Sequence, residues 1–168
     1  MATKVAINGF GRIGRLVARA ILERGDHDLE LVSINDLADT KSNALLFQYD
    51  STHGRFPGTV EVADGALVVN SKSIAVTSER DPGNLPHAAQ GVDIVLECTG
   101  FFQSHEAAEP HLKAGAKRVL ISAPAKNVSA TIVYGVNHEV LTADDVIVSN
   151  ASCTTNCLSP VAKVLHDT

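Results

Sequence analysis

A glycine-rich turn between an apolar run and an amphipathic segment limits the possible folds of this chain more than any other feature. Gly9, Gly11 and Gly14 form the pattern G-x-G-x-x-G directly after a predicted buried strand at residues 5–7 and at the start of a predicted helix at residues 12–24. The first glycine permits a tight turn, the second lets the backbone approach a pyrophosphate, and the third lets the helix pack closely on the sheet. Free N–H groups and the positive dipole of the helix start then hold the anion. The turn therefore predicts a strand–helix unit that binds a dinucleotide.

An acidic residue stands where such a unit is expected to hold a ribose. A second strand is predicted at residues 29–34, and Asp36 follows it closely, 22 residues beyond Gly14. A carboxylate at this point accepts both ribose hydroxyls and repels a 2′-phosphate, and the next residue is Leu37 rather than an arginine. We therefore expect NAD rather than NADP. The alternative is a tight strand–helix turn in an α/β protein that binds another nucleotide or none.

Apolar β-branched runs alternate with helical patterns along most of the chain, which is typical of a doubly wound α/β fold. The segment 59–69 alternates around Asp64 and Gly65, which predicts a hairpin. Further strands are expected at residues 73–78, 93–97, 118–122, 131–136 and 146–149, and further helices at residues 42–49, 106–114 and 152–166. We therefore expect a Rossmann-type, mostly parallel sheet with helices on both faces and a small hairpin insertion.

Helical spacing predicts one apolar face on the first helix. Its members are Ile13, Leu16, Val17, Ala20 and Ile21. Because they recur at i, i+3, i+4, i+7 and i+8, we expect this face to be buried against the sheet.

The composition excludes several classes of protein. With 168 residues, of which 45% are hydrophobic and 20% charged, the chain can bury one globular core, which excludes wholesale disorder. The net charge of −5 argues against a basic nucleic-acid surface. No apolar run approaches the ~20 residues of a membrane span, so we expect neither a nucleic-acid nor a membrane partner.

The cysteines indicate a reducing compartment. Cys98, Cys153 and Cys157 are an odd number in a chain without the pattern of an export signal, so we expect reduced thiols and a cytoplasmic location. We expect no metal site, because Cys153 and Cys157 lack further ligands at zinc-like spacing.

Small polar residues follow several predicted strands. Ligands of an open parallel sheet bind at the carboxyl ends of its strands. The residues there are Arg80, Thr99, Gly100, Phe101, Phe102 and Ser122. The small polar members suit a cofactor lining, and either phenylalanine would form a wall. The alternative for each position taken alone is ordinary loop chemistry.

A cysteine opens the last predicted helix. Cys153 lies in the first turn, where the helix dipole and free N–H groups favour a thiolate, and the hydroxyls of Ser152 and Thr154 suit an anionic substrate group. These features are typical of a nucleophile that attacks a carbonyl while backbone N–H groups stabilise the oxyanion. The alternative is a buried structural cysteine, and we interpret Cys157, one turn later, as a packing residue.

Four motifs in order carry a resemblance to a known family. They are VAINGFGRIGR at residues 5–15, INDL at 34–37, YDSTHG at 49–54 and SCTTN at 152–156. Together they closely resemble the N-terminal half of the glyceraldehyde-3-phosphate dehydrogenase family in its bacterial form. The similarity covers essentially the whole chain, and the last motif is a highly specific signature.

The resemblance implies a role for each matching residue. The NAD contacts of the family correspond to Arg12, Ile13, Asp36, Arg80 and Ser122, with Thr99 and Gly100 nearby. Its nucleophile corresponds to Cys153, with Ser152 and Thr154 as substrate or phosphate contacts. In the family reaction the thiolate adds to the aldehyde of glyceraldehyde 3-phosphate to give a thiohemiacetal. Hydride then passes to the nicotinamide, and inorganic phosphate cleaves the resulting thioester.

The chain departs from the family in its length. Family subunits are about twice as long, and the resemblance implies that the histidine that activates the cysteine lies beyond Thr168. The helical pattern of residues 161–168 also runs to the last residue without a stop signal. We expect residues 1–150 to form the NAD-binding domain and residues 151–168 to begin the catalytic domain. The chain alone should bind NAD and show little or no turnover.

Two other functions remain open at this point. Erythrose-4-phosphate dehydrogenase has the same cofactor fold and cysteine segment, and a non-catalytic NAD-binding module would need no reactive thiol. The resemblance also implies a homotetramer of full-length subunits.

Overall fold

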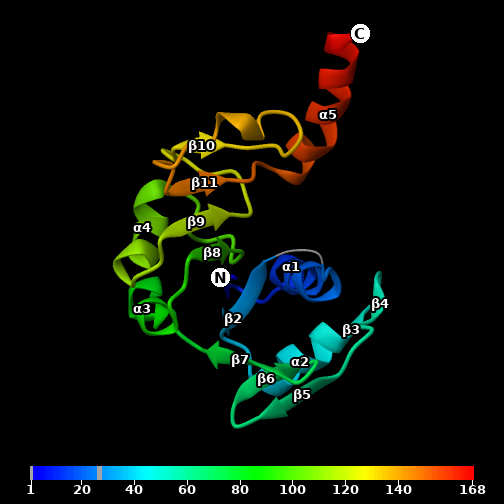
Figure 1. The fold of residues 1–168 in the computed structure, drawn as a ribbon, viewed down its shortest axis with the longest axis vertical. Coiled ribbons are helices and arrows are strands. Elements are labelled where there is room, and N and C mark those ends of the chain that lie inside the picture. The colour runs from blue at the N-terminus through cyan, green and yellow to red at the C-terminus, as the bar shows by residue number, and fades with distance from the viewer. Residues whose placement is uncertain (1, 26–27) are drawn as a thin grey trace.

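One twisted sheet organises the molecule (Figure 1). The structure is a computed structural model that describes residues 2–25 and 28–168. Within these residues the sheet has nine strands in the order β10-β11-β9-β8-β1-β2-β7-β6-β5. In chain order they are β1 (Thr3–Asn8), β2 (Leu29–Asn35), β5 (Val60–Ala63), β6 (Ala66–Val69), β7 (Lys72–Thr77), β8 (Ile94–Glu97), β9 (Arg118–Ile121), β10 (Ala130–Thr131) and β11 (Ile147–Ser149).

The strands from β10 to β7 run parallel, and β6 and β5 complete the sheet antiparallel to their neighbours. The central strand β1 pairs on both sides, so that Ile7 lies opposite Ile34 and Leu96. At the turn of the β5–β6 hairpin, Asp64 and Gly65 have φ angles of 51° and 79°, as a two-residue hairpin turn requires. The expected Rossmann-type sheet with a small hairpin insertion is confirmed.

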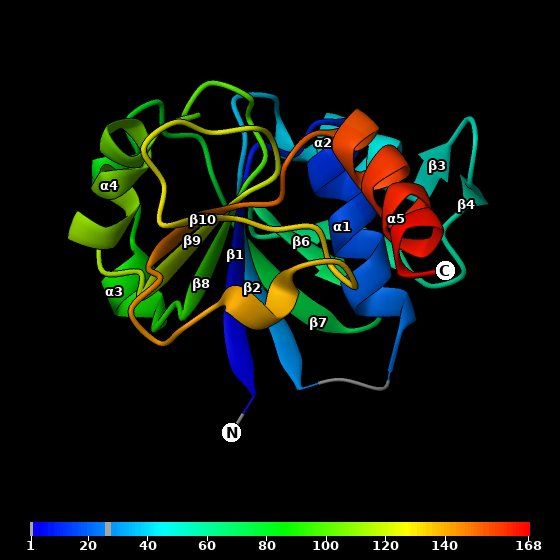
Figure 2. The same cartoon turned by 90° about the horizontal axis from the view of Figure 1, so that it is seen from above.

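Helices cover both faces of the sheet (Figures 1 and 2). The helices are α1 (Arg12–Glu23), α2 (Thr40–Gln48), α3 (His87–Gln90), α4 (His105–Lys113) and α5 (Cys153–Asp167). On one face lie α1 and α2, and on the other α3 and α4. The sequence patterns predicted neither α3 nor the small hairpin of β3 (Tyr49–Asp50) and β4 (Gly54–Arg55).

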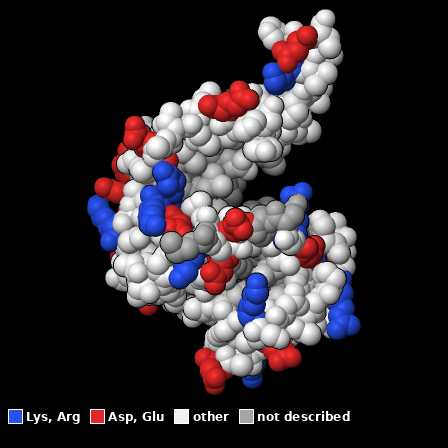
Figure 3. Space-filling model, in the orientation of Figure 1, with Lys and Arg blue, Asp and Glu red and all other residues white. Residues whose placement is uncertain are grey.

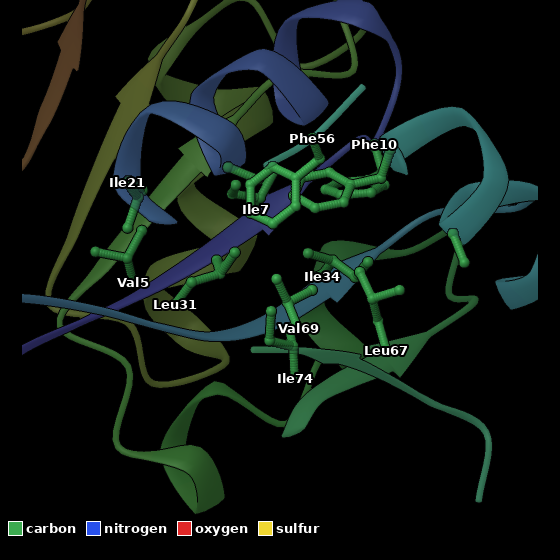
Figure 4. Packing of buried hydrophobic residues seen from close by; sticks show 13 residues of the cluster. Val5, Ile7, Phe10, Ile21, Leu31, Ile34, Phe56, Leu67, Val69 and Ile74 are labelled. Atoms are coloured by element: carbon green, nitrogen blue, oxygen red, sulfur yellow. The ribbon is translucent and has the colours of Figure 1, made fainter. Parts of the chain in front are cut away.

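Alternation along β1 supplies side chains to two separate cores. Val5 and Ile7 point to the α1–α2 side and join a cluster with Phe47 and Leu67 (Figure 4). Ala6 points to the opposite side and packs in the cluster that contains Ala108 of α4. This period of two is what a strand buried on both faces requires.

The buried side of α1 differs from the predicted apolar face. Ile21 is buried and Leu16 and Val17 are half-buried, but Ile13 is 50% exposed and Ala20 is exposed. The buried residues are Gly14, Ala18, Arg19 and Ile21. Two small residues let the helix approach the sheet closely, and an arginine is buried because its guanidinium bonds to backbone carbonyls. The expected face was therefore wrong at its first and fourth members.

The strand expected at residues 131–136 ends almost at once. Only Thr131 of this range lies in a strand. The Asn137 side chain accepts a hydrogen bond from the Val133 N–H at 2.7 Å and donates to the Thr131 carbonyl at 3.0 Å. An asparagine that bonds backbone groups in this way competes with a ladder and favours a turn.

The last helix extends away from the sheet (Figure 1). None of the described residues of α5 is buried. The large apolar residues Leu158, Val161, Val164 and Leu165 are 57–73% exposed. Among the described helices, none has the length and apolar character that a membrane crossing requires.

Candidate functional site

A pocket of about 460 Å³ lies at the carboxyl ends of β1, β2, β7 and β8. It brings together five of the residues expected to bind a cofactor: Gly9, Gly11, Asp36, Arg80 and Thr99. Its lining also contains Asn8, Asn35, Leu37, Glu79, Cys98, Phe101 and Phe102. The carboxyl edge is where an open parallel sheet binds its ligands.

The three glycines of the turn have different surroundings. Gly9 has φ of +89°, and a Cβ there would lie 2.7 Å from the Thr99 backbone nitrogen. A Cβ on Gly14 would lie 2.0 Å from the Gly9 carbonyl oxygen. Gly11 faces open space, because nothing lies within 4 Å of the position that a Cβ would take. Gly11 is also the N-cap of α1, and no side chain caps this helix start. The turn thus leaves room for a diphosphate beside a helix N-terminus, which is the cradle that a dinucleotide needs.

Asp36 joins the end of β2 to the glycine turn. Its Oδ2 accepts from the Phe10 N–H at 2.7 Å and its Oδ1 accepts from the Ala38 N–H at 2.8 Å. These bonds fix the carboxylate at the pocket wall, and each oxygen retains acceptor capacity for a ligand hydroxyl.

The other expected cofactor residues lie around this pocket without lining it. Arg12 donates to Asp50 at 3.1 Å, which ties its guanidinium to the β3–β4 hairpin. Gly100 has φ of +77° and begins the loop after Thr99. The Ser122 N–H donates to the Glu97 carbonyl at 3.0 Å, so Ser122 lies beside the end of β8.

The thiol in the pocket wall is Cys98, not the predicted nucleophile. Burial raises the pKa of Cys98 to about 11, against the opposing effect of a hydrogen bond with the Ser122 side chain. A thiol with so high a pKa is protonated at neutral pH, so Cys98 is a lining group and not a nucleophile.

Cys153 is the first residue of α5, and its side chain is exposed. Ser152 caps the helix by accepting from the Thr155 N–H at 3.0 Å, and its hydroxyl also bonds the Thr154 hydroxyl at 2.9 Å. The preceding residue, Ala151, has φ of 58°, a strained conformation for alanine, and its N–H donates to Ser149. The turn therefore presents the thiol at a helix N-terminus, where it is exposed and not buried.

Cys157 is also exposed, which corrects its interpretation as a packing residue. The reason is that α5 extends away from the sheet and none of its described residues is buried. All three cysteines are free. The part of the chain that the structure describes holds no group of three or more metal-ligating side chains.

The cysteine turn and the pocket belong to the same edge of the sheet. Because β11 is parallel to β9, β8 and β1, the chain leaves β11 at the carboxyl edge and enters α5 there (Figure 2). One side of the molecular surface is deeply hollowed between the part that carries α5 and the part that carries α1, and acidic and basic groups are interspersed on it (Figure 3).

Sequence patterns missed three polar residues of this region. Asn8, Asn35 and Glu97 are the last residues of β1, β2 and β8, and all three are buried. The available signal was a polar residue that ends an apolar strand pattern, because buried polar groups occur where they have partners.

Comparison with known proteins identifies similar chains. A family model described as "Glyceraldehyde 3-phosphate dehydrogenase, NAD binding domain" matches residues 3–105. Glyceraldehyde-3-phosphate dehydrogenase of Zymomonas mobilis is 66% identical over 167 residues, which are 99% of this chain and 50% of the relative. The enzyme of the same name from Xanthobacter flavus is 62% identical over 167 residues, with the same coverage, and that from Clostridium pasteurianum is 59% identical over 165 residues. The chain spans about half the length of the curated relatives it matches.

Proposed function

The chain belongs to the glyceraldehyde-3-phosphate dehydrogenase family through its NAD-binding domain, and from this premise we propose that residues 1–150 form that domain and that residues 151–168 begin a catalytic domain. NAD is therefore the cofactor of the domain. The single observation that carries the proposal is that Gly9, Gly11, Asp36 and Thr99 line one pocket at the carboxyl edge of the sheet.

The residues of this pocket fit NAD. The open space in front of Gly11 and the uncapped start of α1 suit the diphosphate. Asp36 suits the adenosine ribose and, through its charge, disfavours a 2′-phosphate. We propose the complete cofactor set as Gly9, Gly11, Arg12, Ile13, Gly14, Asp36, Arg80, Thr99, Gly100 and Ser122.

We further propose that the whole protein oxidises glyceraldehyde 3-phosphate in the presence of inorganic phosphate. Bound NAD would supply the hydride acceptor. Cys153 would add its thiolate to the aldehyde carbon, and the N-terminus of α5 would stabilise the charge on sulfur and oxygen. The hydroxyls of Ser152 and Thr154, which already bond each other, would bind the substrate or the attacking phosphate.

The isolated chain should bind NAD with little or no turnover. Among the described residues, His53, His111 and His138 bond groups other than the Cys153 sulfur, and a thiol needs a general base to act as a nucleophile. The relatives are twice as long, and we propose that residues in their second half supply this base. A homotetramer of full-length subunits and a cytoplasmic location belong to the same proposal.

Titration of the chain with NAD and with NADP tests the cofactor part of the proposal. We expect saturable binding of NAD and weaker binding of NADP, and no binding at millimolar NAD would overturn it.

Alkylation with iodoacetamide tests the role of Cys153. Cys157 is exposed on the same helix one turn later, so it serves as an internal control that lacks the helix N-terminus. We expect faster labelling at Cys153, measured by peptide mass spectrometry, with Cys153→Ser removing the fast phase. Equal rates at the two thiols would favour a non-catalytic NAD-binding module.

A further inference from the structure

A chain of buried polar side chains runs from the cofactor pocket into the opposite core. Glu97, His111 and His87 are 1%, 0% and 3% exposed. Glu97 Oε2 lies 3.0 Å from His111 Nε2, and His111 Nδ1 lies 3.1 Å from His87 Nε2. On its other side Glu97 contacts Asn8 and Thr99, which both line the pocket. A buried carboxylate therefore stands between the pocket and a pair of buried imidazoles.

The backbone of Glu79 fixes the direction of the bonds on the Asn8 side. Asn35 Oδ1 accepts from the Glu79 N–H at 2.8 Å, so Asn35 Nδ2 must be the group that donates to Asn8 Oδ1 at 2.7 Å. Asn8 Nδ2 is then left to donate to Glu97 Oε2 at 2.6 Å. Neither amide can turn over without setting a donor against a donor.

The second oxygen of Glu97 holds the loop that forms the pocket wall. Glu97 Oε1 accepts from the Thr99 N–H at 2.8 Å and from the Thr99 hydroxyl. That hydroxyl in turn accepts from the Phe101 N–H at 3.1 Å. Phe101 and Phe102 line the pocket, and the Phe102 ring stands edge-on to the His111 ring with centroids 6.2 Å apart. The carboxylate thus anchors the start of this loop through Thr99 and Phe101, and the Gln103 side chain holds Gly100 beside it.

The two histidines complete the set of donors around the Glu97 carboxylate without needing a charge on His87. Burial, and then the neighbouring His111, lower the pKa of His87 to about 4, so this imidazole is neutral at pH 7. In the tautomer that carries its proton on Nε2, His87 donates to His111 Nδ1, which leaves the His111 Nε2–H to donate to Glu97. With Asn8 and Thr99, these donors satisfy both oxygens of a carboxylate, which is the condition for burying one.

We infer that Glu97 is a positioning residue for NAD, which sets the shape of the cofactor pocket by fixing Thr99, the 99–102 loop and the Asn8 amide. This inference rests on the proposed function, since it concerns the affinity of the same pocket. Glu97 itself does not line the pocket. A carboxylate at the end of β8 is costly to bury, and its contacts are directed at pocket residues from two different strands.

The Glu97→Gln substitution tests the inference while keeping the shape of the side chain. If the new amide nitrogen replaces Oε2, it meets the Asn8 donor whichever tautomer His111 adopts. If it replaces Oε1, it meets the Thr99 N–H. In both cases one buried donor loses its acceptor, and we expect the Kd for NAD to rise about tenfold. Binding is measured by calorimetry, and unfolding by urea is measured beside it for each variant.

A pair of variants at Thr99 provides a test that a purely structural role would not pass. Thr99→Val removes the hydroxyl between Glu97 and Phe101, and Thr99→Ser keeps it. We expect Thr99→Val to raise the Kd about as much as E97Q, Thr99→Ser to restore near wild-type affinity, and the E97Q/T99V double variant to bind no more weakly than either alone. If E97Q does not fold, an unchanged NAD affinity of Thr99→Val would still overturn the inference, because the link from Glu97 through Thr99 to Phe101 would then not matter for binding.

The outcomes separate this inference from the proposed function. If the wild-type chain does not bind NAD, the proposed function fails and this inference fails with it. Wild-type binding together with unchanged affinity of E97Q, or strictly additive effects of E97Q and T99V, would overturn the inference alone. A lower stability of E97Q without a change in Kd would also overturn it, because Glu97 would then serve only the fold.

Discussion

At the residue scale, Gly11 and Gly14 differ in what a methyl group would meet. A Cβ on Gly14 would lie 2.0 Å from a backbone oxygen, whereas one on Gly11 would meet nothing within 4 Å. We therefore expect Gly14→Ala to lower the free energy of unfolding by about 2 kcal/mol, because the clash outweighs the gain in helix propensity. Gly11→Ala should leave stability within about 0.5 kcal/mol of wild type and raise the Kd for NAD about tenfold.

Urea unfolding and NAD titration of both variants measure these effects. Each glycine is the matched control of the other, since both belong to the same turn. A stable Gly14→Ala chain would contradict the packing role, and unchanged NAD binding by Gly11→Ala would contradict the approach of a diphosphate to this part of the backbone.

His87 makes the stability of the chain depend on pH. Its pKa is lowered from 6.5 to about 4 by burial and then by His111, so the unfolded chain takes up a proton at this residue before the folded chain does. The stabilisation that follows is fully present above about pH 7 and is lost as the pH falls from 6.5 toward 4, by up to about 3 kcal/mol. His87→Gln keeps a donor for His111 and should remove this dependence.

The measurement is urea unfolding of wild type and His87→Gln at a series of pH values from 7.5 to 4.5. The difference between the two free energies of unfolding cancels the carboxylates that titrate in both proteins. If the free energies of unfolding of the two proteins differ by the same amount at every pH, His87 takes up its proton in the folded chain as readily as in the unfolded chain. The prediction would then be wrong.

Single residues could be predicted where their role depends on position along the chain. Asp36 was identified by its distance from the glycine turn and Cys153 by its place between a strand and a helix, and the structure has them at the pocket wall and at a helix N-terminus. Glu97 could not be identified in this way. Its partners Asn8 and His111 lie 89 and 14 residues away, and only the folded sheet brings the three together.

At the scale of elements, one buried arginine joins α1 to the segments that follow β2. Arg19 donates to the Phe47 carbonyl from Nε at 3.0 Å and from Nη2 at 2.7 Å, and to the carbonyls of Gln48 and Gly54. Arg19→Met would remove the guanidinium donor from all three carbonyls, although the Gln48 carbonyl would keep a bond to the Phe56 N–H. We expect the free energy of unfolding to fall by about 3 kcal/mol.

Arg19→Lys is the matched control for this prediction. Lysine keeps the charge, but it lacks the planar fork with which the guanidinium reaches carbonyls of two elements. The free energy of unfolding of Arg19→Lys should therefore lie between those of wild type and Arg19→Met. Both variants are measured by urea unfolding. An Arg19→Lys chain as stable as wild type would mean that the geometry of the guanidinium is unimportant, and an unchanged Arg19→Met chain would contradict the role of these hydrogen bonds.

Helical periodicity predicted the existence of α1 and its length, but it assigned the buried side by hydrophobicity alone. Ile13 is half exposed because it lies at the start of α1, beside the turn that faces the pocket, while Gly14 and Arg19 are buried for close approach and for hydrogen bonding. The strand expected at 131–136 failed for a related reason, since a side-chain amide from Asn137 takes the backbone partners that a strand would use. Both errors come from polar contacts that periodicity does not register.

At the scale of the whole molecule, the two hydrophobic cores cover the two faces of the sheet, and α5 belongs to neither core. Both clusters draw their members from residues 5–147, and the described residues of α5 contribute none. The exposed apolar residues of α5 are typical of a helix that packs on a further part of the protein. This division supports the proposed boundary near residue 150.

Removal of residues 153–168 tests the boundary. Because α5 buries none of its residues, the shortened chain should unfold at the same urea concentration as the full chain, within about 0.5 kcal/mol, and bind NAD with a Kd within about twofold. Deletion of α4 residues would be no control, since Ala108 and His111 are wholly buried. The matched control is Ala108→Asp, which should unfold the second core. A loss of NAD affinity or stability on removing α5 would mean that this helix packs against the sheet in solution, and the cysteine would then belong to the NAD-binding domain itself.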